Sequence, residues 1–225
     1  MEFLELLHKI FLKDGGWLTI LNGLWVTVQI SALSLLLGTL FGALLCFFRV
    51  GKFKPLKVAA QVYISIIRGS PVLMLLMLLF YGVFARTGIS PLLVAVITFS
   101  MHTGAHVAEL LRSALMALDK GQVEAARTLG FSKFQAFKLV TLPQLVRIAK
   151  PVYQSTVVNL IQWTSVVGYV TITDLTRVIN NIASRTMQPM ITITGGMIIY
   201  LAISYLVYGI FNLTERRKSS VHLAR

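Results

Sequence analysis

The chain has 225 residues, of which 56% are hydrophobic and only 13% are charged, and its formal net charge is +13. Soluble domains carry about a quarter charged residues, so this composition excludes an ordinary soluble domain and indicates an integral membrane protein. The single cysteine, Cys46, cannot form a disulfide within the chain.

Residues 1–16 have an amphipathic pattern, which predicts a short interfacial or docked segment. Beyond them, hydrophobic stretches of about 20 residues or more predict membrane-spanning helices. About five such stretches follow, leaving no room for a separate soluble domain, at roughly 17–48, 58–84, 91–111, 152–172 and 190–213. The expected fold is an all-α integral membrane helical bundle. It forms a single domain over residues 1–225, with a polar loop at 112–151.

Basic residues gather in the connection after the first predicted span, in the 112–151 loop and at the C-terminus. A strongly basic chain can also bind nucleic acid, but segregation of the charge between spans favours a bias of membrane topology. The positive-inside rule then places the N-terminus outside, with the loop and the C-terminus in the cytoplasm.

Small residues recur every four positions in the first predicted span, at Ser34, Gly38 and Gly42. Such spacing allows two helices to approach closely, either within one subunit or between subunits. We expect the contact to lie within the subunit.

Three residues of the third predicted span, His102, His106 and Glu109, have the spacing i, i+4, i+7 and share one helical face. Imidazoles at i, i+4 can share a metal ion, which is the basis for one alternative, a metal-dependent membrane enzyme. The other interpretation is that His102 and His106 line a substrate cavity, while Glu109 pairs with Arg112 one turn further on.

The fourth predicted span is the most polar, and lipid disfavours that composition. Its polar groups should therefore face a bundle interior or a water-filled path. We expect Gln162 to bind substrate or a neighbour, Trp163 to shape a cavity wall and Ser165 to line it. Bonding between helices of the bundle is the alternative for each of them.

The polar loop has dense helix-capping signals. Asp119 can cap a first short helix with Gln122 reaching back, and Gly130 can end it in a left-handed conformation. Ser132 and Gln135 can then begin a second helix, whose length Pro143 should limit. The apolar residues Phe131, Phe134, Phe137 and Val140 recur every three positions, which predicts one face of that helix. From its chemistry alone, the loop either enters a groove of another protein or lies on the lipid headgroups.

Within this loop, Glu124-Ala125-Ala126, Gly130 and Val140-x-Leu142-Pro143 resemble the E-A-A-x-x-x-G-x(9)-I-x-L-P signature of permease subunits of bacterial ATP-binding-cassette importers. Val140 replaces the usual isoleucine. The segments 22–27 (NGLWVT) and 63–71 (YISIIRGSP) also resemble segments of that family, and several further matches resemble its polar-amino-acid subfamily.

The resemblance implies that Glu124, Ala125, Ala126 and Gly130 couple the chain to a separate ATPase. It implies two such ATPase subunits, a second permease subunit, identical or homologous, and an external amino-acid-binding protein. It also implies a bacterial inner-membrane location, ATP and Mg²⁺ bound only by the partner ATPase, and no nucleic-acid partner. No phosphate-binding G-x-x-x-x-G-K-S/T loop occurs in the chain, which fits a transporter subunit that is not itself an enzyme.

The same resemblance gives expectations for residues outside the coupling loop. It implies a structural role for Arg68 near the cytoplasmic side. It also implies that residues 173–189 form an outer loop that contacts the binding protein through polar residues: Asp174, Arg177, Asn180, Asn181 and Arg185. Gln162-Trp163 stand where many polar-amino-acid permeases have Lys-Asp, so a charged substrate contact does not carry over. A passive channel is a further alternative, because its flux would not need ATP.

Overall fold

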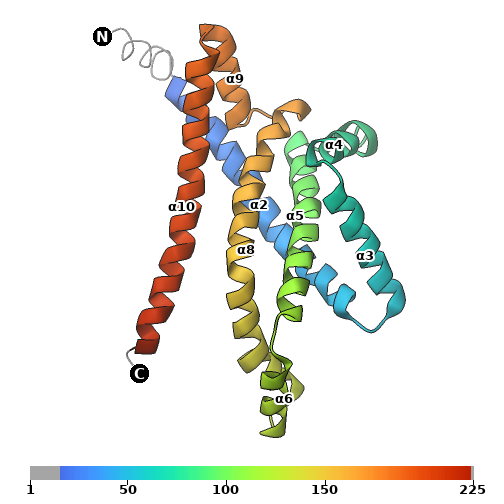
Figure 1. The fold of residues 1–225 in the computed structure, drawn as a ribbon. Helices are drawn as coiled ribbons and strands as arrows, with labels where there is room; N and C mark the ends of the chain where they lie inside the picture. The colour runs from blue at the N-terminus through green and yellow to red at the C-terminus, as the bar shows by residue number, and fades with distance from the viewer. Residues whose placement is uncertain (1–15, 224–225) are drawn as a thin grey trace. The chain divides into compact units, whose positions relative to one another are not determined.

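The computed structural model describes the backbone of residues 16–223 and the side chains of residues 16–213. Within these residues the regular elements are helices, which confirms the predicted all-α class (Figure 1). The amphipathic segment predicted for residues 1–16 lies outside the described residues, apart from its last position.

Among the described residues, three helices are long and apolar enough to cross a membrane, and all three coincide with predicted spans. They are α2 (Gly16–Val50), α5 (Pro91–Met116) and α10 (Pro189–Leu223), the last of which qualifies over Pro189–Leu213. The described residues give up to four spans if one broken pair of helices is counted as a single span. The presence of five spans therefore stays a prediction.

The broken pair replaces the continuous helix expected at 58–84. Helix α3 (Lys54–Gly69) is followed by its C-cap residue Ser70, which is extended with φ −95° and ψ 136°. Helix α4 (Val72–Met77) begins after Pro71 and continues as the π-helix η3 (Leu78–Val83). The physical reason is Pro71, which lacks an N–H and disfavours helical dihedrals in the residue before it.

The polar loop contains the two predicted helices, but Pro143 does not end the second one. Helix α6 (Lys120–Thr128) is followed by α7 (Lys133–Ala136), the π-helix η4 (Phe137–Thr141) and α8 (Leu142–Trp163) in one unbroken run. The N–H of Leu142 donates to Phe137 O, five residues back. Pro143 directly follows this π-turn, and the wider turn accommodates the helix position at which the proline removes an N–H donor.

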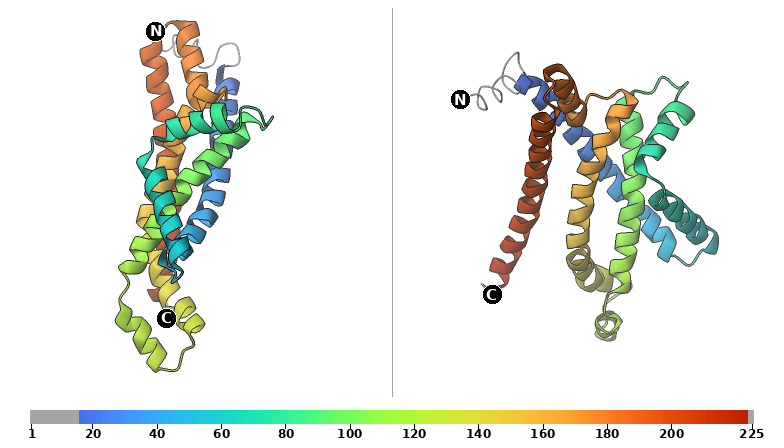
Figure 2. Two further views of the ribbon diagram at one scale, coloured as in Figure 1. Left: turned by 90° about the vertical axis from the view of Figure 1, so that its right-hand side faces the viewer. Right: turned by 45° about the horizontal axis from the view of Figure 1, so that its top comes forward.

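The contacts divide the chain into two compact units, each of which contains pieces of α2, α5 and α8. Unit 1 comprises the residues up to Leu35, Pro71–Phe99 and the chain from Val157 onward. Its core is a cluster of buried apolar side chains: Ile30, Leu76, Ala95, Phe99, Leu160, Val167, Val170 and Ile172. In this unit α8 leads into the 3-10 helix η5 (Thr164–Val170), and α9 (Leu175–Thr186) lies beside α10 (Figures 1 and 2).

Unit 2 comprises Leu36–Ser70 and Ser100–Thr156. Here α2 and α5 approach so closely that a Cβ atom built on Gly42 would lie 2.7 Å from the carbonyl oxygen of Gly104 and 2.7 Å from Cβ of Val107. A Cβ atom on Gly38 would lie 2.9 Å from Cβ of Thr103. The prediction that these glycines pack within the subunit is confirmed. Because lipid provides no hydrophobic drive between helices, such contact relies on close van der Waals packing.

Candidate functional site

The hairpin formed by α6 and α7 in unit 2 is set by local sequence signals. Asp119 is the N-cap residue of α6 and accepts a hydrogen bond from the N–H of Gly121 at 2.9 Å. The predicted reach of Gln122 back to this cap does not occur. Its side-chain oxygen instead accepts a hydrogen bond from Nε2 of Gln144 at 2.8 Å, which ties α6 to α8.

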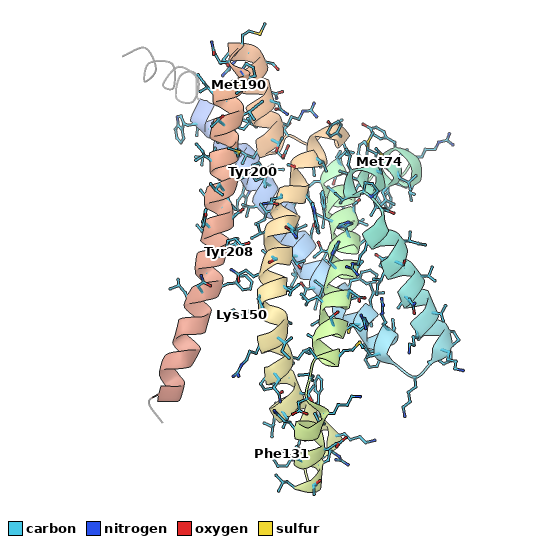
Figure 3. The ribbon with its side chains drawn as sticks, in the orientation of Figure 1. Met74, Phe131, Lys150, Met190, Tyr200 and Tyr208 are labelled. Atoms are coloured by element: carbon cyan, nitrogen blue, oxygen red, sulfur yellow. The ribbon has the colours of Figure 1, made fainter. Side chains whose placement is uncertain are left out.

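The turn after α6 is a Schellman motif centred on Gly130. The N–H of Phe131 donates to Ala126 O, and the N–H of Gly130 donates to Arg127 O, each at 3.1 Å. Gly130 has φ +89°, a conformation that glycine adopts without a steric penalty. The predicted end of α6 is therefore confirmed. Figure 3 labels Phe131, which lies in this turn.

The second helix begins with the predicted capping box. The N–H of Gln135 donates to the Ser132 hydroxyl, and the Gln135 side chain accepts from the N–H of Ser132 at 2.7 Å. The four apolar residues predicted to share one face are instead divided, because the π-turn at η4 changes the helical period after only four residues. Phe134 and Phe137 are exposed, whereas Phe131 and Val140 are half-buried.

The hairpin presents small and apolar side chains to its surroundings. Glu124 and Ala125 are exposed, while Ala126 is buried under the hairpin. Leu129 is 78% exposed and Phe134 is 72% exposed, both outside the predicted spans. Large apolar side chains exposed outside the spans offer area that another protein or the lipid headgroups can cover.

A second polar site in unit 2 is centred on Glu109. Its carboxylate lies 2.9 Å from Nη1 of Arg49 on α2 and 2.5 Å from Nη2 of Arg112 on α5. The guanidinium of Arg68 on α3 is 4.0 Å away. The predicted Glu109–Arg112 pair is present, but sequence reasoning missed Arg49, because no local pattern connects it with a residue 60 positions later.

A cavity of about 320 Å³ adjoins this cluster, entirely within unit 2. Its polar lining includes Arg68, His106, Glu109 and Thr156, and apolar residues of α5 and α8 complete it. His102 is buried beside His106, with the ring centroids 4.8 Å apart, and is not among the lining residues.

The metal-site alternative finds no support in this arrangement. Among the residues that the structure describes, no three His, Cys, Asp or Glu side chains are grouped closely enough to hold a metal ion. Glu109 instead faces three arginines, and its carboxylate charge is compensated by them.

The remaining predicted cavity residues belong to unit 1. Gln162 is exposed near the end of α8, Trp163 packs against the apolar core, and Ser165 is half-buried on η5. An apolar groove of about 230 Å³ between α2, α8 and α10 includes none of the three. Each unit therefore holds part of the predicted set, with His102 and His106 in unit 2.

The outer-loop interpretation of residues 173–189 needs one correction. Asp174 is fully buried and serves as the N-cap of α9, accepting from the N–H groups of Thr176 and Arg177 at 3.0 Å. Burial raises the pKa of Asp174 above its ordinary value, although these hydrogen bonds oppose the shift. The hydroxyl of Tyr200, labelled in Figure 3, lies 3.5 Å from the carboxylate and 2.8 Å from Thr176 Oγ1.

Arg177 is also engaged within unit 1, donating to Gly168 O at 2.7 Å. By contrast, Asn180, Asn181 and Arg185 are exposed on α9 and remain available for contact. An Asp immediately before an amphipathic run is the sequence signal that could have identified the cap.

The known proteins that this chain resembles are components of transport systems. A family model described as the binding-protein-dependent transport system inner membrane component matches residues 34–220. The chain is 34% identical over 200 residues to a probable amino-acid ABC transporter permease protein, YckA, of Bacillus subtilis, with 88% of each chain covered. It is 28% identical over 231 residues to the histidine/lysine/arginine/ornithine transport system permease protein HisM of Salmonella typhimurium, with 96% of each chain covered.

A solved structure described as an amino acid ABC transporter with histidines has a TM-score of 0.79 and 29% identity, covering 88% of this chain and 94% of the other. The fold and the capped hairpin thus define a membrane-spanning transport component. The chain belongs to the family of binding-protein-dependent transport system inner membrane components.

This membership confirms the prediction of an importer permease. The chain is a permease subunit of an ATP-binding-cassette importer in the inner membrane, and ATP hydrolysis belongs to separate partner subunits. Its partners include an ATPase, a binding protein and a second permease. The metal-enzyme and passive-channel alternatives are set aside, because the matched proteins are neither.

Proposed function

We propose that this permease carries a polar L-amino acid, and that the cavity in unit 2 is part of its substrate path. The observation that carries the substrate assignment is this cavity, whose lining combines Arg68 with the hydroxyl groups of Ser113 and Thr156. An amino acid presents a carboxylate that a guanidinium can bind and an ammonium group that can donate to hydroxyl oxygens. The printed names of the relatives YckA and HisM, which concern amino acids, support the same class.

Arg68 is the residue best placed to bind the substrate carboxylate. Among the three arginines around Glu109 it lies furthest from the carboxylate, and its side chain is the most exposed, at 41%. Arg49 and Arg112 compensate Glu109 at shorter distances and leave the Arg68 guanidinium open to the cavity. This assigns Arg68 more than the structural role expected from the resemblance.

The histidines and the unit 1 residues have distinct proposed roles. His106 lines the cavity and contacts the substrate, while buried His102 holds the His106 ring in place. Gln162 and Ser165 provide a neutral polar surface along the path and Trp163 shapes its wall, because Gln162-Trp163 replace the charged pair that the resemblance leads one to expect.

We propose a complex of this chain with a second permease subunit, identical or homologous, two ATPase subunits and an external amino-acid-binding protein. ATP and Mg²⁺ are bound by the ATPase subunits alone. The exposed side of the α6–α7 hairpin, with Glu124, Ala125 and Gly130, contacts the ATPase, supported by its exposed apolar groups. The distribution of basic residues supports an N-terminus outside the cell and a C-terminus in the cytoplasm.

The coupling surface is tested by co-expression of the chain with candidate ATPase subunits. Ala125→Trp places a large side chain on the exposed face of the hairpin, whereas Ser184→Trp places one on the exposed face of α9 as a matched control. We expect the first change to abolish co-purification and the second to preserve it. Equal retention of the ATPase by both variants would contradict the coupling role.

The substrate class is tested by ATP-driven uptake in vesicles that contain the assembled complex and a panel of radiolabelled L-amino acids. Arg68→Gln should raise the half-saturating substrate concentration about 10-fold or more, in line with the loss of a charge-assisted hydrogen bond. The control Lys57→Gln removes an exposed positive charge from the same helix, α3, and should leave this concentration unchanged. Uptake of no amino acid, or equal behaviour of both variants, would refute the substrate proposal.

A further inference from the structure

The 3-10 helix η5 is longer than this conformation usually sustains. It spans the seven residues Thr164–Val170, whereas 3-10 runs beyond about four residues are uncommon because their hydrogen-bond geometry is poor. The chain leaves it through Thr171, whose φ of 68° and ψ of 7° are left-handed. For a β-branched residue such dihedrals are strained, and they persist only where the surrounding structure imposes them.

Two side chains from different elements hold the end of η5. The hydroxyl of Tyr81, on η3, donates to the carbonyl oxygen of Tyr169 at 2.9 Å. Nη1 of Arg177, on α9, donates to the carbonyl oxygen of Gly168 at 2.7 Å. Carbonyl groups in the last turn of a helix have no N–H donor within that helix, so Tyr81 and Arg177 supply the two missing donors.

The segment beyond Thr171 is fixed just as firmly. The N–H of Leu175 donates to Thr27 Oγ1 on α2 at 3.2 Å, and the buried Asp174 carboxylate holds the first turn of α9. The strained Thr171 therefore lies between two restrained ends, which accounts for the strain that it carries.

We propose that Tyr81 and Arg177 are positioning residues that together clamp η5 in its 3-10 conformation, and that Thr171 is the hinge on which this segment moves in the transport cycle. Releasing the two carbonyl groups frees the last turn of η5, and the strain at Thr171 then favours a return to negative φ. Ser165 lies on this segment, so the movement would change the surface that η5 offers to the substrate path. Only the functional half of this proposal rests on the proposed transport function.

The structural half is tested by hydrogen exchange of peptides covering 164–172 in the purified complex. Tyr81→Phe removes only the hydroxyl group, and local opening should become about 2- to 12-fold more frequent, as expected for one lost hydrogen bond. Thr171→Asn introduces a residue that adopts left-handed dihedrals more readily, and opening should become several-fold rarer. Tyr205→Phe removes an exposed hydroxyl group on α10 and should change nothing in these peptides.

The functional half is tested by the maximal rate of uptake and the half-saturating concentration of the same variants, with Arg177→Lys as a conservative change that keeps a donor. If the hinge moves in the cycle, Thr171→Asn should lower the maximal rate while leaving ATPase co-purification intact, and Tyr81→Phe should not lower it. Unchanged exchange in both variants, or faster exchange spread over all of unit 1, would overturn the clamp. The expected exchange changes without any change in uptake would overturn the hinge, whereas absence of uptake in the wild type would refute the proposed function instead.

Discussion

Replacement of Gly130 by alanine tests how the coupling hairpin is shaped. A Cβ atom at this position would meet nothing within 4 Å, so the substitution introduces no steric clash with other residues. The cost comes from the backbone alone, because φ is +89° and an L-residue in the left-handed region loses about 1–2 kcal/mol. That energy corresponds to about a 5- to 30-fold shift in a local equilibrium.

We therefore expect Gly130→Ala to weaken binding of the ATPase subunit to the solubilised permease by about 5- to 30-fold. Gly130→Asn should weaken it much less, since asparagine adopts left-handed dihedrals more readily. Titration of labelled ATPase onto the permease measures both dissociation constants. Equal binding by wild type and Gly130→Ala, or equal weakening by both substitutions, would refute the reasoning.

Three further predictions concern stability, measured by thermal unfolding in detergent. Gly42→Ala should destabilise unit 2 by about 1–3 kcal/mol, because its Cβ atom would overlap α5. The control Gly209→Ala should be neutral or slightly stabilising, because its Cβ atom would meet nothing within 4 Å. Equal effects of the two substitutions would contradict the close packing of α2 against α5. Glu109→Gln should lower the midpoint more than Arg68→Gln does, because it leaves three guanidinium groups without a carboxylate, and the reverse order would exclude Glu109 as their common partner. The folded-state pKa of Asp174 is raised, so its contribution to stability is full below the unfolded pKa of about 3.9 and is lost as pH rises through the folded pKa. The stability of the wild type relative to Asp174→Asn should therefore increase as pH falls from 7 toward 4. An increase as pH rises would show that the folded-state pKa is lowered instead.

Local signals in the sequence predicted the hairpin well. The Ser132–Gln135 capping box and the left-handed Gly130 depend on residues within a few positions of each other, and both are present. Gln122 shows where local reasoning fails. Its side chain had a local partner available, yet it binds Gln144, 22 positions away, because folding brings α8 alongside α6.

The charged cluster around Glu109 was only half predictable, because part of it depends on contacts between residues that are distant in the sequence. The Glu109–Arg112 pair follows from helical spacing, whereas Arg49 joins it through the packing of α2 against α5. The family resemblance implied that Asp174 is a polar contact for the binding protein. The structure buries it as a helix cap, where backbone N–H groups compensate the loss of water.

Photo-crosslinking from the hairpin tests the central claim, that α6 is the site of contact with the ATPase. A photoreactive residue would replace Ala125 on α6 in one variant and Ser184 on α9 in a second, each position being exposed. After illumination of membranes containing the assembled importer, we expect the variant at 125 to form an adduct that an antibody against the ATPase subunit detects, and the variant at 184 to form none. Adducts from 184 alone, from both positions equally, or from neither would contradict the coupling role of this hairpin.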